Sequence, residues 1–556
     1  MATSLLLRRT FLKAATVAAG GLALARPGPA AGAPAARGRR PNIVMMYADD
    51  LDFDELAPYD VRQFPCRTGM VQRGLSTRSL RFYRDARMLT PHIDRLAAEG
   101  ATLTRFYITS AICTPSRYSV LTGRYASRSP GFCRRFPPGT PANIQWNTPL
   151  APDETNVARA LKACGYATGV VGKWHNSGPG GRVRGIAADA DPFDPKLSAT
   201  CHQAQETLCR YLREEIGFDY AARIYHGNKE ELGLPKAMQV HNLEWIAEGA
   251  LDFIEANRAR PFLLYMPLTT PHGGYGSNFL KANPRFTPAG VLEKAPAVMP
   301  PRQSIIKRVQ EKDIDRRNAM ATWIDDCVGA VMAKLEALGL ADDTVFIFVS
   351  DHQSRGKYTC YEGARVPCIV RWPGKIQAGS RVGALCANID LVPTFVEMAG
   401  GRVPETWTVD GRSMVPALTG RETPDDRRKA LLLEVSNIRA VVTDRFKYVA
   451  NRPGKSIADR MQAEAKRAKA TAAPRRLGWD GKENPHTHEK GVRYGADLDF
   501  PHYFDPDQLY DLEADPFEQT NLAGQATHAE TLRRMKDLLA RQLVPLPHTF
   551  AEFKTE

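Results

Sequence analysis

The sequence lacks the features that mark several classes of protein. It contains no zinc-finger spacing, no aromatic RNA-binding motif and no other nucleic-acid signature, so nothing in it supports a nucleic-acid partner. It has no CxxC pair, and its ten cysteines show no regular spacing from which disulfide pairing could be read. The weakly apolar run at 14–25 is shorter than the ~20 strongly apolar residues of a membrane-spanning helix and contains Gly20 and Gly21, so we expect no stable membrane anchor.

Length and composition describe an ordinary globular protein. The 556 residues could form two or three domains, or one large α/β domain with an appendage. Hydrophobic residues make up 43% of the chain and charged residues 24%, which is typical of a soluble protein. The formal net charge of +14 suits a polyanionic ligand, and by charge alone this could be a glycan, a nucleic acid or an anionic membrane.

The N-terminus has the pattern of an export signal. Arg8 and Arg9 precede Lys13 and an Ala- and Gly-rich run, which resembles a twin-arginine signal peptide, although an amphipathic or disordered leader is the alternative. Residues 1–40 would then be a signal and a flexible lead-in, with the twin-arginine translocase as a partner and the periplasm or the exterior as the destination. Cleavage after Ala25 would remove those three basic residues and lower the net charge from +14 to +11.

The cysteines other than Cys113 carry structural expectations only. One or two disulfides would suit an exported protein, and Cys201 with Cys209 is a candidate pair in a region that we expect to be a loop. Three others lie within apolar segments and are expected to be buried thiols: Cys164, Cys327 and Cys368.

Strand-like apolar runs alternate with helical patterns over roughly the first 400 residues. This alternation predicts an α/β fold with a large, mainly parallel sheet sandwiched by helices. Strands are predicted at 42–47, 101–107, 167–171, 262–266 and 344–349. Helices are predicted between Thr90 and Gly100, between Thr155 and Gly165, and at 243–256, 314–338 and 390–400.

Four of the predicted strands are followed by polar side chains. Ligands of open α/β sheets bind beyond the carboxyl ends of the strands, so residues that follow different strands are expected to share one site. These residues are Asp49 and Asp50, Lys173 and His175, His272, and Asp351 and His352.

The end of the chain predicts a smaller C-terminal α+β subdomain. Strand-like pieces at 440–442 and 446–450 and a helix at 529–543 lead us to assign residues 41–430 to the main domain and 431–556 to the subdomain. Two long polar segments, 176–234 and 451–504, are predicted to be loops or insertions that supply substrate contacts. In the second, a basic helical piece is predicted at 464–476, and His486 and His488 are expected to be solvated rather than metal-bound.

The most informative stretch is CTPSR at 113–117, followed by LTGR at 121–124. Pro115 fits the first turn of a helix, which places Cys113 at the helix start. Free backbone N–H groups and the helix dipole favour an anionic group there, either a thiolate or a bound oxyanion, and Arg117 could brace it. The alternative is a buried, inert cysteine beside a helix N-cap.

The carboxylates among the strand-end residues predict a cation. Asp49 and Asp50 cannot share a small space without one, and hard oxygen donors of this kind suit calcium or magnesium. The imidazole of His352 is a less usual calcium ligand. Taken alone, an Asp-Asp pair more often marks a turn or the start of a helix.

The run at 113–124 resembles the signature of the type I sulfatases, which belong to the alkaline-phosphatase-like superfamily. In that family a maturation enzyme oxidises the cysteine to formylglycine (3-oxoalanine), whose hydrate attacks sulfur. The resemblance implies this modification of Cys113, a bound calcium ion, with magnesium as an alternative, and a metal site made of Asp49, Asp50, Cys113, Asp351 and His352. Gln353 stands where the family commonly has glycine, which implies that its side chain could approach the metal or the sulfate.

Further motifs of the family supply the implied catalytic residues. GKWH at 172–175, TPH at 270–272 and the segment at 357–367 with YEG and RVP match it, and DLVPT at 390–394, TDRFKY at 443–448 and LYDL at 509–512 extend the match to nearly the whole chain. The resemblance implies that cations neutralise the sulfate, that His272 and Lys357 assist departure of the alcohol, and that His175 then removes a proton to release sulfate. Each could instead be a surface charge or a loop cap. The implied catalytic set is Cys113, Arg117, Lys173, His175, His272 and Lys357.

We therefore interpret the sequence as an exported, formylglycine-dependent sulfatase that cleaves sulfate monoesters, with a sulfated carbohydrate as the expected substrate and other sulfate esters as the broader class. The fold alone does not fix the substrate. A phosphodiesterase or phosphonate monoester hydrolase of the same superfamily is the alternative. A non-catalytic binding protein with this fold is a more distant one.

Overall fold

The computed structural model describes residues 40–52, 56–59, 88–272, 277–314, 316–353, 357–455, 459, 463, 500–503 and 505–553. The predicted signal and lead-in therefore lie outside the described residues, apart from Arg40. So do the predicted basic helix at 464–476 and the two histidines His486 and His488.

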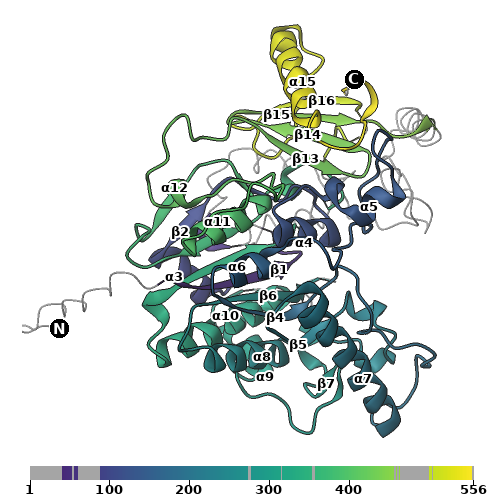
Figure 1. Cartoon of the computed structure of the whole chain (residues 1–556), viewed down its shortest axis with the longest axis vertical. Coiled ribbons are helices and arrows are strands. Elements are labelled where there is room, and N and C mark those ends of the chain that lie inside the picture. The colour runs from purple at the N-terminus through teal and green to yellow at the C-terminus, as the bar shows by residue number, and fades with distance from the viewer. Residues whose placement is uncertain are drawn as a thin grey trace, which may run out of the picture. The chain divides into compact units, whose positions relative to one another are not determined.

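An eight-stranded sheet forms the centre of the fold (Figure 1), in the order β11-β2-β10-β9-β1-β6-β4-β5. Only β10 runs antiparallel to its neighbours, so the predicted mainly parallel sheet is confirmed. Its strands are β1 (Asn42–Asp49), β2 (Ala101–Leu103), β4 (Ala167–Lys173), β5 (Tyr220–Tyr225), β6 (Phe262–Pro271), β9 (Thr344–Ser350), β10 (Cys368–Arg371) and β11 (Ser380–Val382).

The central strands are buried on both faces, which explains their continuous apolar runs. Alternate residues of β1 enter two different cores: Val44 and Met46 pack into one, and Ile43 and Met45 pack into the other. The register brings Ala48 beside Ser350 and Asp49 beside Pro271. The residues that follow β1, β6 and β9 therefore leave the sheet side by side.

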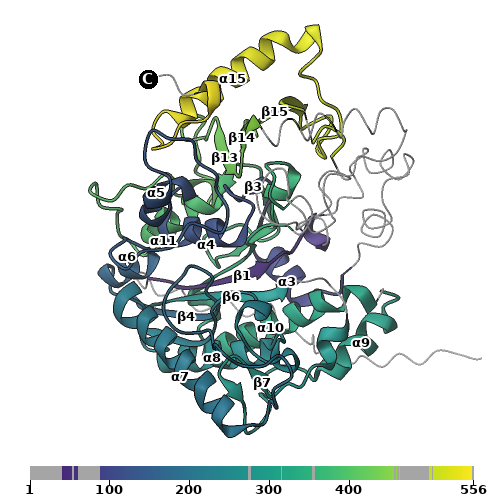
Figure 2. The ribbon, with the colours of Figure 1, turned by 90° about the vertical axis from the view of Figure 1, so that its right-hand side faces the viewer.

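Helices cover both faces of the sheet. Figure 2 shows α4 and α11 on one side of β1 and β6, and α8 and α10 on the other. The helices are α3 (Pro91–Glu99), α4 (Cys113–Thr122), α5 (Pro130–Arg135), α6 (Val157–Ala163), α7 (Pro195–Tyr211), α8 (Leu243–Ala256), α9 (Arg302–Glu311), α10 (Ala319–Ala337), α11 (Leu391–Met398), α12 (Val415–Leu418) and α15 (Ala529–Leu543).

Most predicted helix boundaries agree with the structure. Thr90 and Gly100 flank α3, and the bounds of α8 and α15 match the sequence pattern. At α6 the cap is Asn156 rather than Thr155, because the Asn156 side chain accepts from the backbone N–H groups of Ala158 and Arg159. The helix predicted from residue 314 begins only at Ala319, after a short 3₁₀ turn.

A four-stranded antiparallel sheet lies at the top of Figure 1, in the order β13-β14-β15-β16, and α15 packs on it through Met535, Leu539 and Leu543. Its strands are β13 (Leu431–Val435), β14 (Ile438–Val442), β15 (Phe446–Asn451) and β16 (Asp507–Asp511). Small ladders are formed by β3 (Phe106–Tyr107) with β12 (Cys386–Ala387) and by β7 (Phe286–Thr287) with β8 (Gly290–Val291). The division into domains at residue 430 stays a prediction.

The polar segment 176–234 is not the loop that we predicted. It contains α7, which Asp194 caps by accepting from the backbone of Lys196, and β5, the edge strand of the main sheet. The apolar residues of α7 are sparse along the sequence, but Leu197 and Leu208 fall on its buried side. An amphipathic helix with so narrow an apolar stripe resembles a polar loop in sequence.

The candidate disulfide between Cys201 and Cys209 is absent. Both thiols are free and lie on α7, and eight residues of α-helix rise about 12 Å, which is too far for a disulfide. The nine cysteines that the structure describes are all free. Cys327 and Cys368 are buried as predicted, whereas Cys164 is only partly buried.

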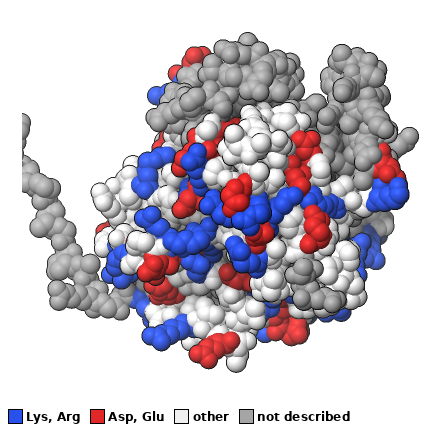
Figure 3. All heavy atoms as spheres, turned by 90° about the horizontal axis from the view of Figure 1, so that it is seen from above, with Lys and Arg blue, Asp and Glu red and all other residues white. Residues whose placement is uncertain are grey.

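Charge is mixed on the surface. Figure 3 shows Lys and Arg side chains interleaved with Asp and Glu on the face that it views. On α15, for example, Arg533 pairs with both Glu530 and Asp537. Within the described ranges, no helix is long and apolar enough to cross a membrane.

Candidate active site

The polar residues that follow β1, β4, β6 and β9 converge on the start of α4. Cys113 is the first residue of this helix, as the position of Pro115 predicts, and it follows Ile112 in extended conformation. Gly123 ends the helix with φ of +72°, a left-handed conformation that favours glycine. The helix therefore directs its free N-terminal N–H groups towards the site.

Cys113 lies in surroundings that favour an anion. Its Sγ atom is 3.1 Å from Nε2 of His352 and 3.9 Å from Oδ1 of Asp49. Burial raises the pKa of the thiol, but the positive charges of Lys173, Lys357 and His352 lower that pKa well below its usual range.

The other buried thiols behave in the opposite way. At Cys327 and Cys368, burial raises the pKa, and the nearby charges do not reverse it. This contrast separates Cys113 from the buried, inert cysteine that was the alternative.

Four of the five predicted metal ligands point at one another. Asp49, Cys113, Asp351 and His352 are buried, and their candidate ligand atoms all lie within 4.8 Å of one another. Burial, followed by the negative charge of Asp49, raises the pKa of Asp351 to about 7. Two carboxylates held this close need a positive charge between them, so the donor set fits a divalent cation, and its oxygens suit calcium or magnesium.

The fifth predicted ligand, Asp50, has other partners. Its carboxylate accepts from Nζ of Lys357 over 3.0 Å and lies 2.9 Å from Nδ1 of His352. Its backbone N–H donates to Oδ1 of Asp351 over 3.2 Å. Asp50 therefore fixes the orientations of Lys357, His352 and Asp351 from the rim of the cluster.

Two buried cations lie beneath the cluster. Arg117 is fully buried and donates to Oδ2 of Asp351 over 2.9 Å and to the carbonyl of Lys173 over 2.9 Å. Lys173 donates to Oδ2 of Asp49 over 2.5 Å and to Oδ1 of Asn228 over 2.6 Å. Each buried cation therefore has a carboxylate partner, as buried charges require.

A pocket of about 510 Å³ gives access to these residues. Four of the predicted catalytic residues line it, namely Cys113, His175, His272 and Lys357, while Arg117 and Lys173 lie below. The other lining residues are Thr114, Trp146, Ser177, Arg182, His226, Asn228, Glu231 and Tyr358. The structure thus brings all six predicted catalytic residues into or beneath one pocket.

The two histidines of the pocket differ in their surroundings. Burial, with the charge of Lys173, lowers the pKa of His272, so this imidazole is mostly neutral near pH 7. Its Nε2 atom is 4.0 Å from Oδ2 of Asp50. His175 faces Glu231, with 3.5 Å between Nε2 and Oε2, and its buried Nδ1 has no hydrogen-bond partner in the part of the chain that the structure describes.

The side-chain amide of Gln353 contacts backbone carbonyls of the segment that follows it. Its side-chain amide nitrogen donates to the carbonyl of Glu362 over 3.0 Å and to that of Arg365, and its backbone N–H donates to the carbonyl of Gly363 over 3.2 Å. These hydrogen bonds tie the side chain to the turn at 362–365. Its approach to the metal or the sulfate stays a prediction.

The sequence did not single out the pocket residues that follow β5. Asn228 and Glu231 lie just beyond the carboxyl end of this strand, where the same rule that found the other site residues would have found them. They were missed because β5 was assigned to a loop. Trp146 lies in an irregular segment and has no sequence signal that we can identify.

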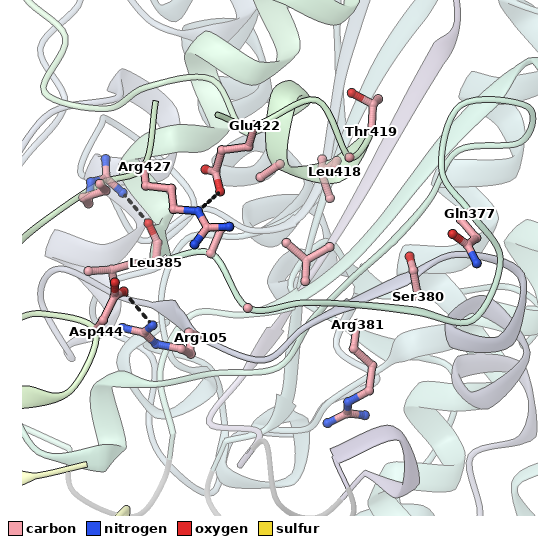
Figure 4. A pocket seen from close by; sticks show the side chains of 16 residues that line it. Arg105, Gln377, Ser380, Arg381, Leu385, Leu418, Thr419, Glu422, Arg427 and Asp444 are labelled. Atoms are coloured by element: carbon pink, nitrogen blue, oxygen red, sulfur yellow. Dashed lines mark hydrogen bonds and ion pairs between the residues drawn. The ribbon is translucent and has the colours of Figure 1, made fainter. Parts of the chain in front are cut away.

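A second pocket of about 510 Å³ lies between β11 and the segment at 417–428 (Figure 4). Three of its four arginines pair with carboxylates: Arg105 with Asp444 at 2.8 Å, Arg427 with Glu422 at 3.5 Å and Arg428 with Asp390 at 2.5 Å. The fourth, Arg381, donates to the carbonyl of Pro58 over 2.8 Å. Among the described residues that line it there is no cysteine or histidine. It therefore lacks a counterpart of Cys113 and of the histidines that line the first pocket.

Comparison with known proteins gives the family of the chain. The Sulfatase family profile matches residues 41–401, and a profile described as N-sulphoglucosamine sulphohydrolase, C-terminal, matches residues 352–452. Human arylsulfatase A is 28% identical to this chain over 94% of it and 88% of the relative. The N-acetylgalactosamine-6-O-sulfatase of Bacteroides thetaiotaomicron is 25% identical over 90% of this chain and 93% of the relative.

A solved structure of similar fold is that of a protein in complex with its substrate D-glucosamine-2-N,6-O-disulfate. The TM-score is 0.55 at 18% identity, over 91% of this chain and 98% of the other. The predicted alkaline-phosphatase-like α/β fold is confirmed.

Proposed function

This chain belongs to the sulfatase family and is a sulfuric ester hydrolase, and from that premise we propose that it cleaves sulfate monoesters of carbohydrates with a formylglycine made from Cys113 and a divalent cation. The observation that carries this proposal is the cluster of Asp49, Cys113, Asp351 and His352 at the base of a pocket. Calcium is the cation that we favour, with magnesium as the alternative.

The carbohydrate substrate has separate support. The chain is similar over 90% of its length to a sulfatase named for N-acetylgalactosamine. In the pocket, the ring of Trp146 packs edge-on against Tyr358 with 5.0 Å between their centroids, and such aromatic groups offer an apolar surface to a sugar ring.

The cation would be held by Asp49, Asp351, His352 and residue 113. When present, the cation would supply positive charge to the sulfate oxygens, and the formylglycine would supply the hydroxyl that attacks sulfur. Arg117 and Lys173 add fixed positive charge below the cluster. Because both are already held by Asp351 and Asp49, they need little reorganisation to stabilise negative charge.

The proton transfers fall to residues that line the pocket. The leaving alcohol needs a proton, which the ammonium group of Lys357 can donate. Asp50 accepts a hydrogen bond from Nζ of Lys357 and so positions it. The largely neutral His272 lies beside the same carboxylate. Release of sulfate requires a base for the remaining hydroxyl, and His175 can accept that proton. Glu231, 3.5 Å from Nε2 of His175, would stabilise the imidazolium that results.

The experiment that tests this proposal is mass analysis of the tryptic peptide at 106–117, from protein produced together with a formylglycine-generating enzyme. We expect an aldehyde or its hydrate in place of the Cys113 thiol, and turnover of a small aryl sulfate only by the modified protein. An intact thiol in a protein that hydrolyses the aryl sulfate would overturn the formylglycine mechanism. Faster turnover of a phosphodiester or a phosphonate monoester would favour the alternative from the same superfamily.

Export is part of the proposal and rests on the sequence of residues 1–40. Replacement of Arg8 and Arg9 by Lys should retain the protein in the cytoplasm, since the twin-arginine translocase recognises that pair. Fractionation of cells followed by immunoblotting measures this. Equal export of the wild type and the variant would refute a twin-arginine route.

A further inference from the structure

Arg182 is a cation of the pocket wall that the proposed reaction does not use. It lies between β4 and α7, lines the same pocket as Cys113, and is 47% exposed. Its Nε donates to Nδ1 of His226 over 3.1 Å, and its Nη2 is 3.5 Å from Oε2 of Glu231. No residue of the described ranges accepts a hydrogen bond from its Nη1.

His226 holds Arg182 without neutralising it. Since Nε2 of His226 is 3.2 Å from the carbonyl of Gly178, Nε2 carries the hydrogen, and Nδ1 is the acceptor for Arg182. Burial, with the charge of Arg182, lowers the pKa of His226 to about 4, which agrees with a neutral imidazole. The histidine therefore orients the guanidinium and leaves its charge in place.

Glu231 compensates little of that charge. One oxygen of this carboxylate accepts from Nδ2 of Asn228 over 2.9 Å, and the other lies 3.5 Å from both His175 and Arg182. An exposed ion pair at 3.5 Å contributes little, and here a single carboxylate is shared by two basic groups. Positive charge at Arg182 therefore remains available to a ligand.

The arrangement depends on a glycine. A Cβ atom at Gly227 would lie 2.6 Å from Oε2 of Glu231, 3.3 Å from Cδ2 of His175 and 3.5 Å from Nη2 of Arg182. The first distance is too short for any other residue without displacement of the carboxylate. Glycine thus permits the three side chains to meet on one wall of the pocket.

We propose that Arg182 forms a subsite for a second anionic group of the substrate, either a carboxylate or a second sulfate on the same or the adjoining sugar. This subsite rests on the proposed function of the pocket, because the reaction proposed for the scissile sulfate draws on the charges of Arg117, Lys173 and Lys357 and leaves Arg182 unused. A planar guanidinium with free donors binds such oxyanions through two parallel hydrogen bonds, and its fixed orientation adds specificity.

Kinetics with four substrates test the subsite. They are a small aryl sulfate, a monosulfated amino sugar, the same sugar with two sulfates, and a monosulfated disaccharide that contains a uronate. We expect Arg182→Gln to lower kcat/KM for substrates with two anionic groups by about 10- to 100-fold more than for those with one, mainly through KM. A loss confined to the uronate identifies a carboxylate as the ligand, and a loss confined to the disulfated sugar identifies a sulfate.

Arg184→Gln is the matched control, because Arg184 is an exposed arginine two residues away that does not line the pocket. It should leave all four rates unchanged. Arg182→Lys keeps the positive charge but loses the two parallel N–H donors of the guanidinium. It should therefore retain only part of the wild-type preference for substrates with two anionic groups.

If Arg182→Gln lowers kcat/KM equally for all four substrates, or leaves it unchanged for all of them, the proposed subsite is refuted. If the matured protein hydrolyses no sulfate ester, the proposed function fails on its own. Calorimetric binding of the disulfated and monosulfated sugars to the wild type and Arg182→Gln then decides the subsite, since equal affinities for the two proteins would refute it.

Discussion

Lys173 reaches Asp49 across a strand that lies between their own. β6 separates β4 from β1 in the sheet, yet Nζ of Lys173 donates to Oδ2 of Asp49 over 2.5 Å. Both side chains are buried, so each depends on the other to offset the loss of water. The link connects Asp49, one of the four clustered candidate ligands, to the positively charged residues at the base of the site.

Removal of the Lys173 charge should destabilise the protein. Lys173→Met removes the closest cation of the buried Asp49 and leaves it with Arg117 at 3.6 Å, which costs up to about 3–5 kcal/mol of unfolding free energy, and added calcium should recover part of that loss. Chemical denaturation with and without calcium measures both effects. Lys162→Met is the control, because its pair with Asp219 is partly exposed and should contribute less than about 1 kcal/mol. Equal losses in the two variants would contradict the prediction.

Activity should depend on Cys113 and on no other buried thiol. Cys113→Ala, produced with the maturation enzyme, should lower kcat for an aryl sulfate by about a thousandfold or more, because the nucleophile is lost. Cys327→Ala alters a thiol in the hydrophobic core and should keep the activity of each folded molecule. A Cys113→Ala protein with wild-type turnover would favour a mechanism without this residue.

Calcium should stabilise the fold through the cluster at the strand ends. At free calcium of about 100 times its Kd, the unfolding free energy should rise by about 2.7 kcal/mol, and a chelator should reverse the rise. Asp351→Asn should abolish the response because it removes one of the two buried carboxylates. Asp342→Asn changes a carboxylate that is 92% exposed and should leave the response intact. Differential scanning calorimetry distinguishes these outcomes.

Acid should weaken the fold through His226. Its pKa is about 4 in the folded protein, below the value of about 6.5 in an unfolded chain. Between these values the unfolded chain binds more protons, so the contribution of His226 is present above pH 6.5 and is lost as the pH falls towards 4.

His226→Asn tests this, since the amide can accept from Arg182 but does not titrate. The wild type should lose up to about 3 kcal/mol more than the variant between pH 7 and pH 4. Unfolding free energies measured across that range give the difference. Parallel pH profiles would show that His226 does not titrate in the folded state as described.

The base of the site was predictable and its wall was not, for physical reasons. The strands β1, β6 and β9 are buried on both faces, so their sequences are unbroken apolar runs, and the polar residues at their ends are conspicuous. The edge strand β5 is only partly buried and resembles a loop in sequence. Three residues of the pocket wall flank that strand or the polar helix α7, namely Asn228, Glu231 and Arg182. The sequence therefore predicted only that the segment 176–234 supplies substrate contacts and did not single out these residues.

The side chain of Gln353 shows that the contacts of a residue cannot be predicted from its neighbours in the sequence alone. Its position beside His352 suggested an approach to the metal or the sulfate and gave no sign that its amide nitrogen donates to the carbonyls of Glu362 and Arg365. Contacts with backbone carbonyls distant in the sequence decide the orientation of this buried amide, and such long-range contacts leave no local pattern in the sequence.

The burial of Cys113 sets a time limit on its proposed oxidation. Only 1% of Cys113 is exposed in the folded chain, so a maturation enzyme cannot bind this residue once the chain has folded. The backbone N–H of Glu434 donates to the carbonyl of Thr109, so the segment before Cys113 is secured by a strand that follows 321 positions after that cysteine. At ~5–20 residues per second, the ribosome needs on the order of tens of seconds to reach that strand. Slower translation should therefore raise the fraction of modified enzyme.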